Sequence, residues 1–167
     1  PGIDFRLEEM KGYDAAAMEI MPHAWKAGPQ TVLLRKQLEA MKDGGTMIMT
    51  VPLAPYRCPP GPYERASMVA HYMKANKPKS KLVILDPKKA FSKQPVFTEA
   101  FTRHYKDIVE MNLSNDIDDY SVTAFDVNSC ISGPSSLESP RVTKRVTPRK
   151  SVPNQSVAEL SFAVYGD

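Results

Sequence analysis

The sequence is poor in the residues that build metal sites and disulfide frameworks. Its 167 residues include two cysteines and three histidines. Two cysteines, Cys58 and Cys130, allow one disulfide and exclude the multiple bridges of small secreted domains. The histidines, His23, His71 and His104, are far apart and lack metal-ligand spacing, so we expect no metal site.

Long hydrophobic runs are also missing. No stretch approaches the roughly 18 consecutive apolar residues of a membrane span, and no basic-then-apolar signal segment opens the chain. The chain begins at Pro1 rather than at a methionine, so we expect it to be a fragment of a longer protein. Apolar residues make up 42% of the sequence, which is enough for a domain core.

The excess of positive charge is small and lies near the end of the chain. The formal charge is +3, and residues 128–155 carry five basic residues against one acidic residue, with six serines and four prolines. Such a segment buries too little apolar surface to offset its ordering entropy, so we expect residues 128–167 to be a disordered tail. Residues 128–155 contain no aromatic side chain, so we expect no nucleic-acid partner.

The rest of the chain alternates between strand and helix patterns. Residues 46–51 and 81–86 are near-continuous apolar runs, typical of parallel strands that are buried on both faces. A helical pattern from Gly61 to Asn76 separates them and predicts a right-handed βαβ unit in a Rossmann-like α/β fold. The other expected elements are helices at 13–21, from Pro29 to Gly44 and at 95–106, strands at 108–113 and 120–127, and a strand or short helix within 157–165.

The turn between the first strand and its helix differs from that of a dinucleotide-binding fold. Such a fold uses a glycine-rich turn, whose backbone N–H groups bind pyrophosphate at the helix N-terminus. Here Gly61 is accompanied by prolines, which remove N–H donors and add bulk. Asp86, at the end of the second strand, occupies the place of a ribose-binding acid, but without the glycines we interpret it as a strand-end residue. The prolines of this turn are Pro52, Pro55, Pro59, Pro60 and Pro62.

The same turn carries a thiol and a carboxylate. Cys58 precedes a helix N-terminus, whose dipole favours a thiolate, and Arg57 adds positive charge. Glu64, in the first turn of that helix, can accept a proton if it is half-buried. The alternative is a buried free cysteine and a helix-capping glutamate, and these residue types alone do not decide between the two interpretations.

A second candidate group is His23 with Trp25, the only tryptophan. The two side chains could line a site. An aromatic residue that packs a loop onto the core is the commoner arrangement, and we favour it here.

Residues 54–67, with the sequence APYRCPPGPYERAS, resemble the flavoprotein subunit of flavocytochrome c sulfide dehydrogenases, relatives of the sulfide:quinone oxidoreductases in the pyridine nucleotide-disulfide oxidoreductase superfamily. The resemblance extends over about residues 1–115 and includes segments 1–5, 22–28, 34–39 and 91–95. It implies a flavoprotein with two dinucleotide-type domains. Residues 1–44 would then be a linker from the FAD domain plus a covering helix, 45–127 a partial NAD-like Rossmann domain, and 128–167 the tail.

The resemblance also implies roles for individual residues. Cys58 matches the cysteine of a redox-active disulfide beside the flavin, and Glu64 matches a carboxylate proposed as a base. Pro1 and Gly2 resemble the end of the FAD-domain strand that approaches the flavin. The implied substrate is sulfide or another reduced sulfur compound, the cofactor is FAD, and the electron acceptor is a c-type haem cytochrome subunit. A persistent disulfide fits a periplasmic location.

The chain departs from this family in what it lacks. The glycine-rich FAD motif is absent, and so is the region that carries the partner cysteine, so we expect the fragment to be inactive alone and not to hold FAD. Cys130 has no family counterpart and is not assigned as the partner of Cys58, although a disulfide between them remains possible. The alternatives are a non-catalytic interaction module with a basic tail, and an NAD(P)H- or quinone-linked flavin disulfide reductase.

Overall fold

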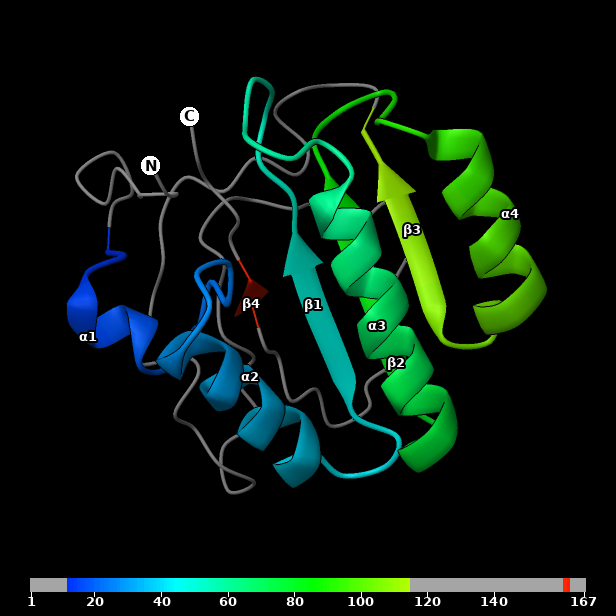
Figure 1. The fold of residues 1–167 in the computed structure, drawn as a ribbon. Helices are drawn as coiled ribbons and strands as arrows, with labels where there is room; N and C mark the ends of the chain where they lie inside the picture. Colours follow the sequence, from blue (N-terminus) through cyan, green and yellow to red (C-terminus); the bar gives the residue numbers. More distant parts are fainter. Residues whose placement is uncertain (1–11, 115–160, 163–167) are drawn as a thin grey trace.

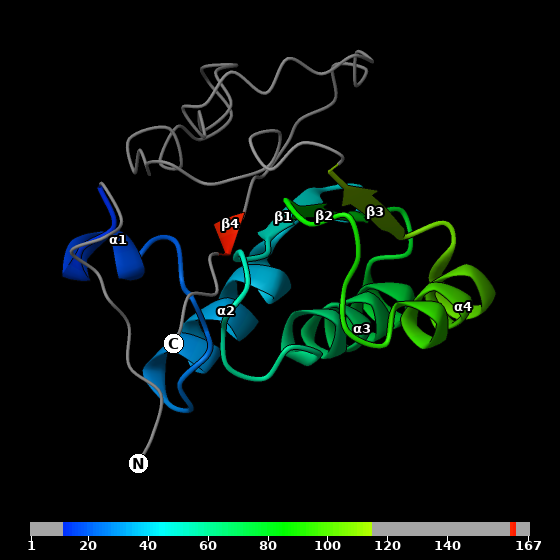
Figure 2. The same cartoon turned by 90° about the horizontal axis from the view of Figure 1, so that it is seen from above.

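The computed structural model describes residues 12–114 and 161–162 of the chain. In this part, a parallel sheet with strand order β3-β2-β1-β4 lies behind three helices, α2, α3 and α4, which share one side of it (Figures 1 and 2). The elements are α1 (Ala15–Met18), α2 (Pro29–Ala40), β1 (Thr46–Thr50), α3 (Gly61–Asn76), β2 (Lys81–Asp86), α4 (Gln94–Tyr105), β3 (Val109–Leu113) and β4 (Ser161–Phe162).

The centre of the fold is the unit β1-α3-β2. All neighbouring strands pair in parallel, with Met47 opposite Leu82 and Met49 opposite Ile84. Helix α3 crosses in front of the sheet between the two strands, which gives the right-handed connection expected from the sequence (Figure 1). The α/β class, the parallel sheet and its first three strands are therefore confirmed.

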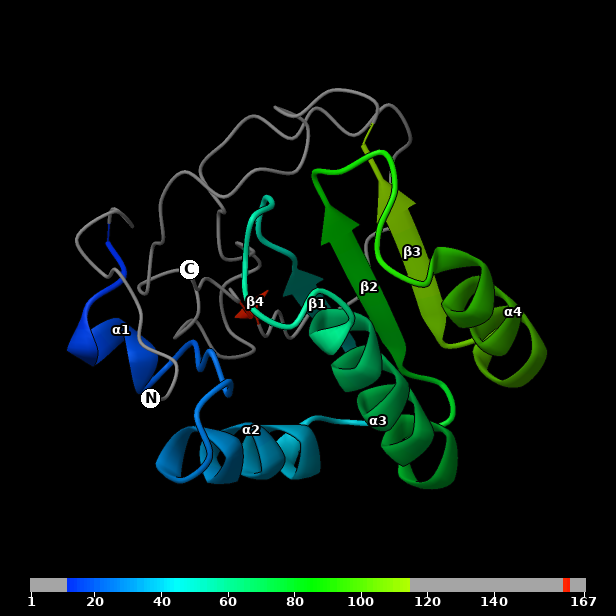
Figure 3. The ribbon, with the colours of Figure 1, turned by 45° about the horizontal axis from the view of Figure 1, so that its top comes forward.

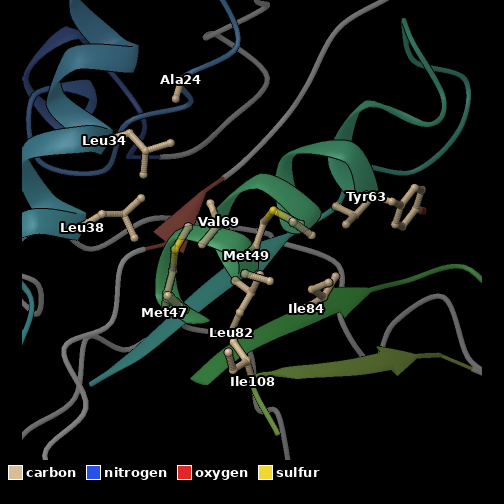
Figure 4. Packing of buried hydrophobic residues seen from close by; sticks show 14 of the residues in the cluster. Ala24, Leu34, Leu38, Met47, Met49, Tyr63, Val69, Leu82, Ile84 and Ile108 are labelled. Atoms are coloured by element: carbon tan, nitrogen blue, oxygen red, sulfur yellow. The ribbon is translucent and has the colours of Figure 1, made fainter. Parts of the chain in front are cut away.

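The hydrophobic core lies between the sheet and α3. Met47, Met49, Leu82 and Ile84 alternate along β1 and β2 toward the helix and are 0% exposed (Figure 4). The opposite face is less buried than the apolar runs predict, because Ile48, Val83 and Leu85 on it are only half-buried. The core residues of α3 recur at helical spacing and include small residues that allow close approach to the sheet: Ala66, Val69, Ala70 and Met73.

The N-terminal helices are shorter than predicted. Only Ala15–Met18 forms α1, with the Asp14 carboxylate accepting a hydrogen bond from the Ala17 N–H at 2.9 Å. The chain around α1 is fixed by the Tyr13 hydroxyl, which donates to the Met21 carbonyl at 2.8 Å. Helix α2 ends at Ala40, before the glycines, and buries Leu34 and Leu38 against the main core.

Several predictions fall outside the described residues. These are the strand at 120–127, most of the tail, and the positions of Pro1, Gly2 and Cys130. Within the segment 157–165, Ser161–Phe162 forms β4, parallel to β1.

Candidate functional site

The candidate site is the carboxyl edge of the parallel sheet. The segment after β1 rises from this edge and turns back into α3, and the segment after β2 leaves the same edge on its way to α4 (Figure 3). In open α/β sheets this edge is where ligands bind. The topology therefore brings residues 51–60 and 86–93 together at the expected position.

Cys58 is exposed and lies near the end of the first segment, three residues before α3. Within the described part of the chain it is a free cysteine, and its backbone has a φ of 56°, in the left-handed region. The N–H of Gly61 donates to its carbonyl at 2.8 Å and closes the turn just before α3. The buried-cysteine alternative is therefore wrong, since this thiol is exposed to reagents and partners.

Glu64 is exposed in the first turn of α3. The sequence-based role of Glu64 as a proton acceptor required half-burial, and the described residues do not bury it. Its N–H bonds to the Pro60 carbonyl at 3.1 Å, as part of the helix start, while its carboxylate is on the solvent side. Cys58, three residues before α3, and Glu64, in its first turn, are thus both exposed at the corner of the fold where α3 begins, here called the Cys58 corner.

Beneath this corner lies a buried polar cluster that sequence reasoning missed. The carboxylate of Asp86, which is 0% exposed, accepts a hydrogen bond from the Tyr63 hydroxyl at 2.6 Å. It also accepts from the Lys88 ammonium at 2.7 Å and from the Lys88 N–H at 3.0 Å. The Asp86 carboxylate thus bonds to Tyr63 and Lys88 within the domain, which supports its interpretation as a strand-end residue rather than a ribose ligand.

Burial dominates the electrostatics of this cluster. It raises the pKa of Tyr63, and the hydrogen bond and charge of Asp86 raise it further. Tyr63 therefore stays a neutral donor throughout the ordinary pH range. Burial also lowers the pKa of Lys88, while the hydrogen bond and charge of Asp86 oppose that shift. The sequence placed Asp86 at the end of a strand, but no local sequence pattern indicated its hydrogen bond to Tyr63.

The loop at residues 22–28 packs against the start of α3. The Nδ1 atom of buried His23 accepts a hydrogen bond from the backbone N–H of Trp25 at 3.0 Å. The Arg65 guanidinium of α3 donates to the Ala24 carbonyl at 2.7 Å. The Trp25 ring covers Gly61 so closely that a Cβ there would lie 2.2 Å from it. The packing interpretation of His23 and Trp25 is therefore confirmed.

We expect His23 to make stability depend on pH below neutrality. Burial, followed by the charges of Lys26 and Arg65, lowers the pKa of His23 from 6.5 to about 4. Since the unfolded chain then binds the proton more tightly, the free energy of unfolding falls as the pH drops below 6.5 and levels off below about 4. Between pH 7 and pH 5.5 this loss should be about 1 kcal/mol, measured by urea denaturation.

The variant His23→Asn provides the comparison, because its side-chain oxygen can still accept the Trp25 N–H without titrating. Its stability should be nearly constant over the same pH interval, where most carboxylates remain ionised. If the free energy of unfolding depended on pH equally in the variant and in the parent chain, His23 would not be the source of the pH dependence.

The described residues lack a membrane-spanning helix and a cluster of metal-ligating side chains. None of the helices in residues 12–114 is long and apolar enough to cross a membrane. The same residues contain no group of three or more His, Cys, Asp or Glu side chains that could hold a metal ion.

Fold and site together define a class of protein. It is an α/β domain with a Rossmann-like parallel sheet, whose ligand edge presents a thiol and prolines where nucleotide-binding relatives have a phosphate-binding turn. Residues 31–133 match a family model described as "Sulfide dehydrogenase (flavocytochrome c) flavoprotein chain, central". The chain belongs to this family.

The described residues do not by themselves fit the pyrophosphate of FAD, the cofactor that the family implies. The turn after β1 is closed by its own backbone bond from Gly61 to Cys58, and Pro59 and Pro60 lack the N–H donors of a phosphate cradle. Pro1 and Gly2, the predicted FAD contacts, lie outside the described residues.

Proposed function

We propose that this chain is a fragment of an FAD-dependent sulfide dehydrogenase and that Cys58 supplies one sulfur of its redox-active disulfide. The proposal rests on one observation above all, the exposed thiol at the carboxyl edge of the sheet. Membership of the sulfide dehydrogenase flavoprotein family supports the substrate class.

The chemistry proposed for this thiol is thiol–disulfide exchange. Hydrosulfide attacks one sulfur of the disulfide, a new sulfur–sulfur bond forms, and the other cysteine sulfur leaves as a thiolate. In the complete protein, FAD would supply the two-electron oxidant for this chemistry, and a c-type cytochrome subunit would be the electron acceptor. Such a disulfide persists in an oxidising compartment, so we place the protein in the periplasm.

Glu64 is proposed as the group that accepts the proton of the incoming sulfur nucleophile. It lies one turn into the helix that follows Cys58 and is exposed on the same corner.

The test uses the complete flavoprotein that contains this domain. Sulfide should bleach the flavin of the parent protein, and Cys58→Ser should abolish bleaching while flavin binding is retained. Glu64→Gln should slow the reaction by about a hundredfold, the usual effect of removing a general base. Met68→Leu, at an exposed position of the same helix, is the control and should react at the parental rate. Bleaching of Cys58→Ser at the parental rate would refute the proposal.

A further inference from the structure

Lys88 contacts the segment that carries Cys58 at two places before the cysteine, and Tyr56 links one of them to the residue after it. The Lys88 ammonium donates to the Pro52 carbonyl at 2.9 Å, near the start of the segment. It also lies 5.2 Å from the centroid of the Tyr56 ring, within cation–π range. The hydroxyl of Tyr56 then donates to the Pro59 carbonyl at 3.1 Å, immediately after Cys58.

Lys88 is itself firmly held. Its ammonium and its backbone N–H both bond to Asp86 Oδ1, and Tyr63 occupies Oδ2 of the same carboxylate. The Lys88 side chain is only 14% exposed and that of Asp86 is 0% exposed. Tyr63 is stacked on Phe91 with the ring centroids 3.8 Å apart, which fixes the other side of the cluster. The anchor of the Cys58 segment is therefore the end of β2, a rigid element.

The Cys58 turn needs such an anchor. A side chain with a Cβ is disfavoured in the left-handed region by roughly 1 kcal/mol, so the conformation persists only where neighbouring contacts impose it. The prolines around Cys58 fix their own φ angles but do not impose that of Cys58. The Lys88 ammonium reaches the segment from beyond β2, at the Pro52 carbonyl and the Tyr56 ring, and the Tyr56 hydroxyl passes the contact on to Pro59.

We propose that Lys88 and Tyr56 are positioning residues, which hold the Cys58 thiol at the N-terminal end of α3. Lys88 fixes the start of the segment and the ring of Tyr56, and Tyr56 transmits this constraint to the residue after the cysteine. The importance of this arrangement for catalysis rests on the proposed function of Cys58, but the arrangement can be tested without flavin or sulfide.

The experiment uses the 167-residue chain with Cys130→Ser, so that Cys58 is its single thiol. The first measurement is hydrogen exchange of the Gly61 amide, which bonds to the Cys58 carbonyl and reports closure of the turn. Tyr56→Phe removes one hydroxyl and keeps the ring against Lys88. It should speed this exchange about fivefold, the equivalent of one hydrogen bond. The Leu82 amide, bonded to the Ile108 carbonyl within the sheet, should exchange at its parental rate.

The second measurement is alkylation of Cys58 by iodoacetamide, scored by the mass of its peptide. Tyr56→Phe should slow alkylation about threefold, because a freed turn no longer keeps the sulfur at the positive end of α3. Lys88→Met should have the same two effects as Tyr56→Phe, whereas Lys88→Arg, which keeps the charge and the hydrogen bonds, should restore parental behaviour. Tyr56→Phe decides the result if Lys88→Met does not fold.

The proposal would be overturned if folded Tyr56→Phe exchanged its Gly61 amide and alkylated its Cys58 thiol at the same rates as the parent chain. An equal loss of protection at Gly61 and Leu82 would overturn it as well, since that result indicates a general loss of stability rather than positioning. Neither outcome bears on whether Cys58→Ser abolishes sulfide oxidation, so failure of this proposal and failure of the proposed function can be distinguished.

Discussion

Replacing Asp86 with alanine should lower the free energy of unfolding by about 3–5 kcal/mol, the range observed when one partner of a buried ion pair is removed. The substitution leaves the Lys88 ammonium in a site that is 14% exposed, and it removes the acceptor of the buried Tyr63 hydroxyl. Urea denaturation at pH 7, followed by the fluorescence of the single tryptophan, measures the loss. Asp107→Ala, at an exposed position, is the matched control and should change stability by less than about 0.5 kcal/mol.

A second variant separates the unpaired charge from the lost packing. Asp86→Asn keeps an oxygen that accepts from Tyr63 but no longer balances the charge of Lys88. Adding Lys88→Met to Asp86→Asn should recover part of the stability, because the uncompensated ammonium is then absent. If the double variant is no more stable than Asp86→Asn alone, the buried charge is not the source of the cost.

The central βαβ unit could be predicted because its signals are local. The apolar runs that became β1 and β2 have strand length, and the helix between them begins at Gly61 and ends at Asn76, where the sequence places its boundaries. Prolines and glycines therefore predicted both ends of α3, whereas α2 ends at Ala40 and not at the predicted Gly44. The length of α1 was predicted less well, because Asp14 specifies where a helix starts and not how far it continues.

The place of the candidate site could be predicted, but not what supports it. The order strand, turn, helix puts Cys58 at the carboxyl edge of any parallel sheet. The hydrogen bonds among Tyr63, Asp86 and Lys88 join the first turn of α3 to the end of β2, over 23 residues of sequence. They depend on the position of the helix over the sheet, which no local pattern encodes. For the same reason, the exposure of Cys58 and Glu64 became visible only in the structure.

The contact between Gly61 and Trp25 leads to the second large effect, a loss of about 1–3 kcal/mol of unfolding free energy in Gly61→Ala. Alanine ordinarily stabilises a helix relative to glycine, so the expected sign is opposite to that of helix propensity. The added Cβ would lie 2.2 Å from one ring atom of Trp25 and 3.0–3.1 Å from two others. The backbone that carries the ring is held on this side of α3, because the Trp25 backbone N–H is bonded to buried His23 and Arg65 holds the neighbouring Ala24 carbonyl.

Urea denaturation of Gly61→Ala should therefore show the loss, accompanied by a shift in the emission of Trp25, whose ring must leave its present contact. The same substitution in a Trp25→Phe background should cost less, because the smaller ring does not reach as far as the indole. The difference between the two costs measures the steric coupling between the loop at 22–28 and the start of α3. An alanine variant as stable as the parent chain would mean that the loop moves freely, and that the Cys58 corner is held by the end of β2 alone.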